Sequence, residues 1–137
     1  MRVTSRSEQD AQRVSKRALL RREWYPAQIN EAGESVSQKG NDYIALTLVV
    51  SAGDGDERTF RDVLTNTPLG AAKLRHACEA VGVLAKYEAG EISQDDFPGH
   101  DVQVKIGVEK KRGFPDRNVI EDYQAAASAV IDLRAAR

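Results

Sequence analysis

The sequence predicts a mainly β domain of five antiparallel strands with one or two helices. Apolar residues recur at every second position in residues 44–50 and again in residues 102–108, which is the pattern of a strand with one buried face. Residues 68–81 instead repeat their apolar residues at intervals near 3.6, as an amphipathic helix does. Stretches rich in glycine, proline and aspartate separate these segments, so we expect neighbouring strands to pair as hairpins.

The composition fits one soluble globular domain with a modest core. The chain has 137 residues, of which 41% are hydrophobic and 30% are charged, and its formal net charge is −1. The single cysteine, Cys78, excludes an internal disulfide and favours a reducing compartment. No apolar run approaches the roughly 20 residues of a membrane span, and the first residues lack the apolar core of a secretory signal. We therefore expect a cytoplasmic protein without membrane contact.

The first part of the chain predicts a basic arm followed by a long strand. Residues 1–17 are polar and arginine-rich, so we expect a flexible arm outside the domain. The apolar residues from Leu19 to Ile29 predict the first strand, in which Pro26 indicates an edge position or a bulge. Residues 31–41 contain two glycines and two serines and are expected to form a loop.

The next two strands are predicted at residues 43–50 and 58–65, joined by a turn at residues 51–56. In the first of them the apolar stripe that begins at Ile44 would face the core, which places Tyr43 on the opposite face. Phe60 and Leu64 would lie on one side of the following strand. These two strands form a predicted hairpin.

The second half of the chain predicts a helix and another hairpin. Thr67 is a suitable N-cap and Pro68 a suitable first residue for a helix that ends before Gly82. Residues 83–96 are less regular and leave room for a second short helix. Strands at 102–108 and 118–123 flank a turn-rich stretch, and the alanine-rich residues 124–137 predict a C-terminal helix or tail.

This order of elements suggests an OB-type barrel. Three strands, a helix and two further strands are the arrangement of that small, partly open Greek-key barrel, here expected over residues 18–123 with the helix between the third and fourth strands. The same order is also compatible with other small α+β folds.

No arrangement of residues indicates catalysis, a metal or a cofactor. His76 and Cys78 are two positions apart, so on a helix their side chains point in different directions and cannot share a metal. Residues 53–57 lack the glutamate that completes a calcium loop, and a hairpin turn explains them better. No loop ends in the Gly-Lys-Ser/Thr of a phosphate-binding motif. We expect no enzymatic activity; a nuclease accessory would need a carboxylate–histidine cluster.

Cations interleaved with aromatic residues point to single-stranded nucleic acid, whose bases stack on rings while its phosphates meet cations. Residues 105–117 carry five cations against two acidic residues, whereas residues 86–101 carry one cation against five acidic residues. The predicted stacking residues are Tyr43 and Phe114. The predicted phosphate contacts are Lys39, Arg58, Arg61, Lys105, Lys110, Lys111, Arg112 and Arg117.

The alternative for the charged hairpin is an ordinary solvated turn whose lysines keep a sheet edge soluble. Polarised charge also occurs in proteins that bind nothing charged. We assign Phe60, and at least one of Trp24 and Tyr25, to the core rather than to a binding surface.

Five segments resemble, in the same order, those of a phage and prophage family. They are Tyr25–Ile29, Lys39–Leu48, Leu74–Gly82, Gly99–Ile106 and Asn118–Tyr123. The family is catalogued mainly as a domain of unknown function and is similar to phage single-stranded-DNA-binding proteins of OB fold. The resemblance implies sequence-tolerant binding of single-stranded DNA, with partners among phage replication or recombination proteins. It leaves homo-oligomer formation open.

One departure and one alternative accompany this resemblance. Bacterial housekeeping single-strand binders end in an acidic tail that recruits partners, whereas this chain ends in the helix-like residues 125–137 and a terminal arginine. The alternative is a protein-interaction or assembly module on the same barrel, without nucleic-acid binding.

Overall fold

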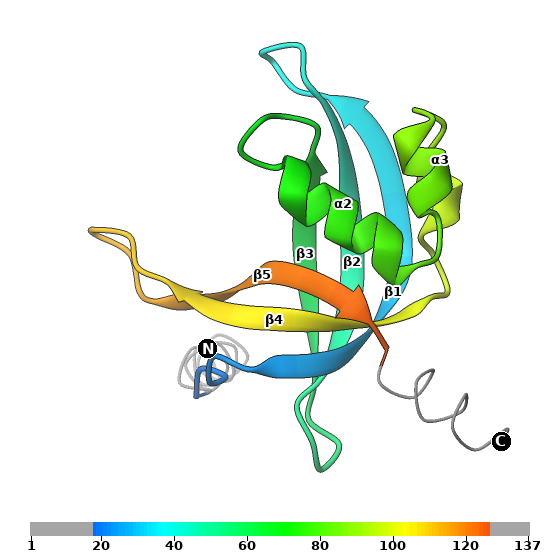
Figure 1. Cartoon of the computed structure of the whole chain (residues 1–137). Coiled ribbons are helices and arrows are strands. Elements are labelled where there is room, and N and C mark those ends of the chain that lie inside the picture. Colours follow the sequence, from blue (N-terminus) through cyan, green and yellow to red (C-terminus); the bar gives the residue numbers. More distant parts are fainter. Residues whose placement is uncertain (1–17, 127–137) are drawn as a thin grey trace, which may run out of the picture.

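The chain folds into a mainly β structure, shown in Figure 1 as a computed structural model that describes residues 18–126. The strands are β1 (Trp24–Val36), β2 (Asp42–Ser51), β3 (Glu57–Thr65), β4 (Asp101–Glu109) and β5 (Arg117–Ala125). The helices are α2 (Ala71–Ala80), α3 (Leu84–Glu88) and the short 3-10 helix η1 (Gln94–Asp96). All five strands are antiparallel and share one sheet, so the predicted class is confirmed.

The sheet has the order β3-β2-β1-β4-β5, with the long strand β1 at its centre. The first residues of β1 pair with β4 and the later residues pair with β2, with an overlap at residues 27–28. Figure 1 shows β4 and β5 crossing β1–β3 at a steep angle, because the sheet curls along β1. Within residues 18–126 no backbone pairing joins the edge strands β3 and β5, so the sheet is not closed.

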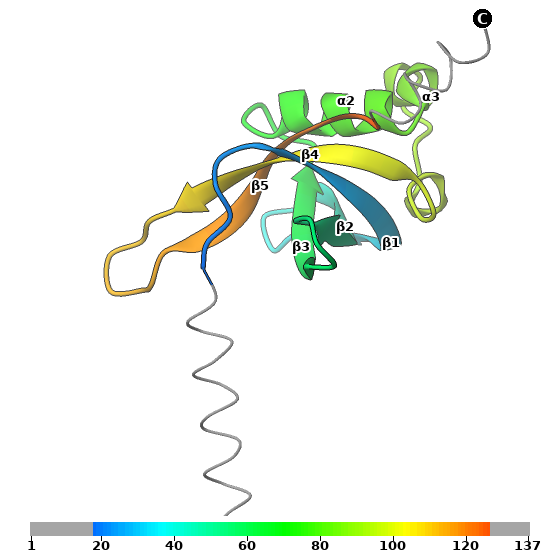
Figure 2. The ribbon, with the colours of Figure 1, turned by 90° about the horizontal axis from the view of Figure 1, so that it is seen from below.

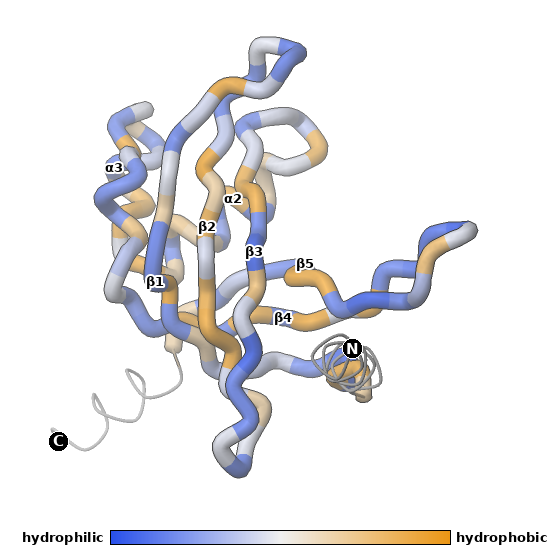
Figure 3. Tube along the Cα trace, turned by 180° about the vertical axis from the view of Figure 1, so that it is seen from behind, coloured by the Kyte–Doolittle hydropathy of each residue, from blue (hydrophilic) through white to orange (hydrophobic). Residues whose placement is uncertain are grey.

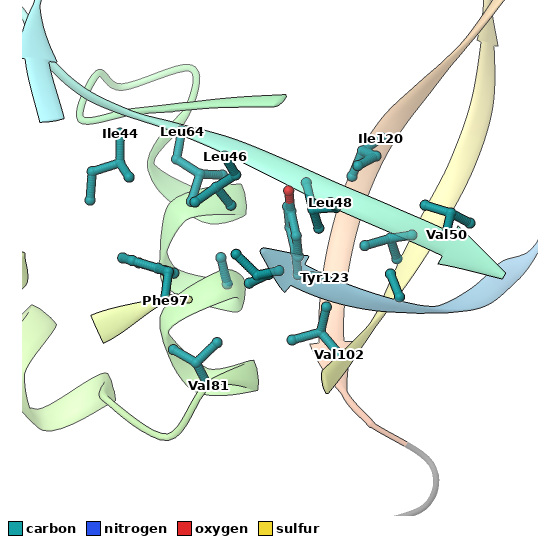
Figure 4. Close-up of a cluster of buried hydrophobic side chains, with 14 of the residues drawn as sticks. Ile44, Leu46, Leu48, Val50, Leu64, Val81, Phe97, Val102, Ile120 and Tyr123 are labelled. Atoms are coloured by element: carbon teal, nitrogen blue, oxygen red, sulfur yellow. The ribbon is translucent and has the colours of Figure 1, made fainter. Parts of the chain in front are cut away.

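The core lies on the inner face of this curled sheet, against α2. Ile44, Leu46, Leu48 and Val50 are all buried, which confirms the face predicted for this strand. Figure 4 shows these side chains beside those of β5 and the helical region. Cys78 is fully buried in the same cluster, as expected of a packing cysteine.

The loop predicted at residues 31–41 is wrong over its first six positions, because β1 continues to Val36. Residues 31–36 pair with residues 42–47 of β2, after a register shift between Ile29 and Glu31. Of these six residues only Ala32 and Val36 are apolar, and most of the six are exposed, so no apolar alternation marks them. Backbone hydrogen bonds to an apolar neighbour strand are sufficient to order a polar strand.

The predicted bounds of three elements need smaller corrections. The first strand begins at Trp24 rather than near Leu19, and α2 begins at Ala71 rather than at Pro68. Thr67 does not cap this helix; its Oγ1 accepts a hydrogen bond from the Gly70 N–H within the preceding turn. Residues 124 and 125 belong to β5. The expected arm at 1–17 and the expected helix from residue 127 lie outside the described residues.

Candidate nucleic-acid interface

The tip of the β4–β5 hairpin, residues 110–116, projects beyond the body of the structure (Figures 1 and 2). Phe114 is 64% exposed there. The Lys111 Nζ lies 5.0 Å from the centre of the Phe114 ring, and the Phe114 N–H donates to the Lys111 carbonyl over 3.0 Å. The turn therefore presents an aromatic ring and an adjacent cation on one short segment.

The predicted cations of this tip are exposed and mostly unpaired. Lys110, Lys111 and Arg112 have no ion-pair partner among the residues that the structure describes. Arg117, at the start of β5, donates instead to the Glu109 carboxylate over 2.8 Å. Three cations are therefore available at the tip, while the fourth braces the two strands where the turn begins.

Residues 20–23 hold the projecting hairpin in place. The Asn118 side chain accepts from the Leu20 N–H and donates to the Leu20 carbonyl, over 2.7 and 3.0 Å. The Ile106 N–H donates to the Glu23 carbonyl over 2.9 Å. Arg22 adds an ion pair with Glu121 at 3.3 Å. The hairpin is therefore anchored on a third backbone segment, which restricts how the tip can move.

The outer face of β2 and β3 holds two more of the predicted residues. Arg61 is exposed and lies opposite Thr47, and Tyr43 is half-buried opposite Thr65. Tyr43 lies on the face away from Ile44, as its position in the strand predicts. Lys39 is exposed in the loop between β1 and β2. Figure 3 shows this face from behind, with the β4–β5 hairpin projecting to the side of the molecule on which β3 lies.

Arg58 lies on the other face of β3, in register with the core residue Val50. Its guanidinium is half-buried, donates to the Asp56 carboxylate over 3.0 Å and donates to the Ala18 carbonyl over 2.8 Å. These contacts fasten the start of the described chain to the β2–β3 turn. A phosphate would have to displace both, so Arg58 serves the fold rather than an open binding surface.

Lys105 is separated from the β2–β3 face by β1. Its cross-strand neighbours are Trp24 on β1 and Asp122 on β5. Trp24 is 37% exposed, whereas Tyr25 is partly buried and packs against the core cluster, so the prediction that one of the two belongs to the core holds only in part. The sequence contained a signal for this arrangement. Tyr25 is in phase with the buried residues Ala27 and Ile29, so Trp24 falls on the opposite, outer face of the strand.

The described residues contain no group of three or more His, Cys, Asp or Glu side chains arranged to hold a metal ion. His76 Nδ1 and Asp122 Oδ1 lie 2.7 Å apart, as an isolated pair between α2 and β5. Burial raises the pKa of the Cys78 thiol to about 11, so at neutral pH it stays protonated and is a poor nucleophile. No helix within residues 18–126 is long and apolar enough to cross a bilayer.

Comparison of the chain with known protein families and with curated proteins gives no match. The functional argument therefore rests on the geometry above. That geometry gathers three exposed cations and one ring at the hairpin tip and places Tyr43 and Arg61 on the neighbouring sheet face.

Proposed function

We propose that the protein binds single-stranded DNA with little sequence preference, on an OB-type barrel. The sheet order, with β1 between β2 and β4, and the position of α2 in the chain after β3 support this barrel. Side chains link its two edge strands. Tyr123 Oη on β5 donates to Asp62 Oδ2 on β3 over 2.7 Å, and Lys73 Nζ on α2 donates to Asp62 Oδ1 over 2.8 Å.

One observation carries the proposal: seven of the ten candidate residues lie on the strands and loops that correspond to those OB barrels use for binding. Such barrels bind oligonucleotides on the face of their second and third strands and on the loops that join the first to the second and the fourth to the fifth. Tyr43 and Arg61 lie on that face, Lys39 lies in the first of those loops, and the hairpin tip is the second.

The chemistry divides between phosphates and bases. Lys110, Lys111 and Arg112 supply point charges and a guanidinium that meet phosphates, while Phe114 offers a ring on which any base can stack. None of these contacts selects a base, so the expected binding tolerates sequence. Because the chain resembles phage single-stranded-DNA-binding proteins, the proposed role is in phage replication or recombination, with proteins of those processes as partners. The single cysteine favours the cytoplasm as the compartment.

The experiment is a fluorescence titration of labelled oligo-dT with the full chain at several salt concentrations. Each phosphate contact contributes about 0.7 to the slope of log affinity against log salt for a single strand. Changing Lys110, Lys111 and Arg112 to Ala is therefore expected to weaken binding at low salt and to reduce this slope by about 2. Oligo-dA and duplex DNA of equal length measure base and strand preference.

A charge-matched control separates local contacts from overall charge. Arg21, Arg75 and Lys86 are exposed cations outside the proposed surface, each within 4 Å of a carboxylate. Changing these three residues to Ala removes the same charge and should leave the slope as it is. An equal loss in both triple variants would contradict a specific tip contact and would leave only long-range attraction.

A second candidate, a protein-interaction module, is favoured by the exposed apolar residues. Leu69, in the turn before α2, is 98% exposed, and Val36 and Val63 are also exposed. A wild-type protein that binds no oligonucleotide at low salt would favour this second candidate.

A further inference from the structure

A cavity of about 730 Å³ opens between the sheet and the two helices. It lies where β1 ends and β2 begins, and it reaches α2 and α3. The buried and half-buried part of its apolar lining comes from four separate segments and consists of Ile44, Leu64, Leu74, Tyr87 and Ile92. The exposed Val36 also lines it. This volume and lining are typical of a site that takes an apolar group from a ligand.

Acidic side chains line the same cavity. Glu34, Asp42 and Glu88 are all exposed, and only Glu88 has an ion-pair partner among residues 18–126, with Arg75 at 3.8 Å. An apolar interior with carboxylates around it favours a ligand that joins an apolar side chain to positive charge, and it disfavours nucleic acid. The cavity meets the proposed DNA face at Tyr43.

The chain itself contains a segment of this chemistry. Residues 1–17 carry five cationic and two acidic residues, whereas residues 18–126 carry 13 cationic and 18 acidic residues. The segment is therefore positive and the described domain negative. Near its start, Val3 lies next to Arg2 and three residues before Arg6, which joins an apolar side chain to two cations.

The point where this segment joins the domain lies within reach of the cavity. The Ala18 carbonyl is bound to the side chain of Arg58 on β3, and the cavity is lined by Leu64 on the same strand. Arg58 and Leu64 are six residue steps apart on β3, which corresponds to about 20 Å along the strand. The fifteen residue steps from Val3 to Ala18 span up to about 50 Å, so the segment is long enough to reach the cavity.

We propose that the basic N-terminal segment docks into this acidic cavity of the same chain, with Val3 against the apolar lining and Arg2 and Arg6 at Glu34 and Asp42. A covalent tether of this length supplies an effective concentration in the millimolar range, which lets weak contacts suffice. Each exposed ion pair contributes about 1.4- to 5-fold to such an equilibrium, so two pairs contribute roughly 2- to 30-fold. This proposal does not depend on DNA binding.

The experiment is paramagnetic relaxation in the full 137-residue chain, with a nitroxide on Ser7→Cys. Cys78 is fully buried, so the engineered thiol reacts selectively. We expect the amide signals of Ile44, Leu64 and Ile92 to lose intensity, equally at high and low protein concentration. About 1 M salt, which shortens the Debye length to about 3 Å, should restore these signals.

Two charge-reversal variants make the test specific. Glu34→Lys with Asp42→Lys should restore the cavity signals. Glu57 and Asp101 line a separate, smaller cavity together with Gln28 and Gln103. Glu57→Lys with Asp101→Lys makes the same change of charge there and should leave the signal loss unchanged. Signal loss that disappears on dilution would assign the contact to a second copy and overturn the proposal. Loss around Gln28 and Gln103, or no loss at all, would overturn it too.

Discussion

Changing Tyr123 to Phe is expected to destabilise the fold by removing the hydrogen bond that joins the two edge strands. The hydroxyl donates to Asp62 over 2.7 Å, and the ring is only 2% exposed. A hydrogen bond to a charged group contributes about 1.5–3 kcal/mol. Because Lys73 still neutralises Asp62 and the Phe ring keeps the packing, the loss should stay within this range. For a domain of this size it corresponds to a fall in Tm of about 6–12 °C.

The same residue predicts how stability depends on alkaline pH. Burial raises the pKa of Tyr123 well above its usual value of 10.0, and the charge of Asp62 and their hydrogen bond act in the same direction. The unfolded chain therefore loses this proton near pH 10 while the folded protein keeps it. The stabilisation is fully present below that pH and is lost as the pH rises toward the folded-state pKa. In the Tyr123→Phe variant, the free energy of unfolding should no longer contain this pH-dependent contribution, so it should fall less steeply at alkaline pH.

Urea unfolding followed by circular dichroism, between pH 7 and the alkaline limit of the fold, measures both effects. Tyr87→Phe is the matched control: it also removes a tyrosine hydroxyl, and that hydroxyl has no hydrogen-bond partner among the described residues. The control should change the free energy of unfolding by no more than about 0.5 kcal/mol. Equal stability of the Tyr123 variant and wild type at pH 7 would refute the view that this hydroxyl holds the edges together.

Two further substitutions test the face and the core. Tyr43→Ala should weaken oligo-dT binding by about five- to 150-fold without changing the salt slope, because a stacked base is worth roughly 1–3 kcal/mol and no phosphate contact is removed. Unchanged affinity with normal stability would place the DNA on another face. Phe97→Ala should lower the free energy of unfolding by about 3–5 kcal/mol because this ring is fully buried. Thermal unfolding measures this loss. The control is Phe114→Ala, whose ring is exposed and whose removal should leave the stability unchanged.

The sequence predicted those strands and helices whose residues repeat with a recognisable period within the element itself. The alternation through Ile44 and Val102 reports a strand with one buried side, and the glycine at position 82 has a φ of 82°, the conformation expected after a helix end. Residues 31–36 carry no such pattern, because their order comes from pairing with β2 and not from burial. Local composition therefore missed half of the central strand.

The candidate site shows the same division between local and nonlocal information. The tip was predictable because its charges and its ring are consecutive in the sequence. The outward position of Trp24 depends on where β1 begins, and the cavity lining comes from four separate segments. Neither follows from a short stretch of sequence.

Two arginines on one strand show why register, and not composition, decides which cations are available. Arg58 and Arg61 are three residues apart, so they fall on opposite faces of β3. The pairing of Val50 with Arg58 turns that side chain toward the inner side, where Asp56 and Ala18 bind it, and leaves Arg61 exposed beside Thr47. Both residues add equally to the net charge, yet only Arg61 can approach a phosphate without breaking contacts.

The positions of the charges also make a net charge of −1 compatible with the proposed DNA binding. Figures 1 and 2 show the hairpin tip and α3 on opposite sides of the molecule. The four residue steps from Lys105 to Glu109 on β4 alone cover about 13 Å, which exceeds the Debye length of about 8 Å at physiological salt. A phosphate at the tip therefore responds to Lys110, Lys111 and Arg112, while the carboxylates around the cavity are screened from it.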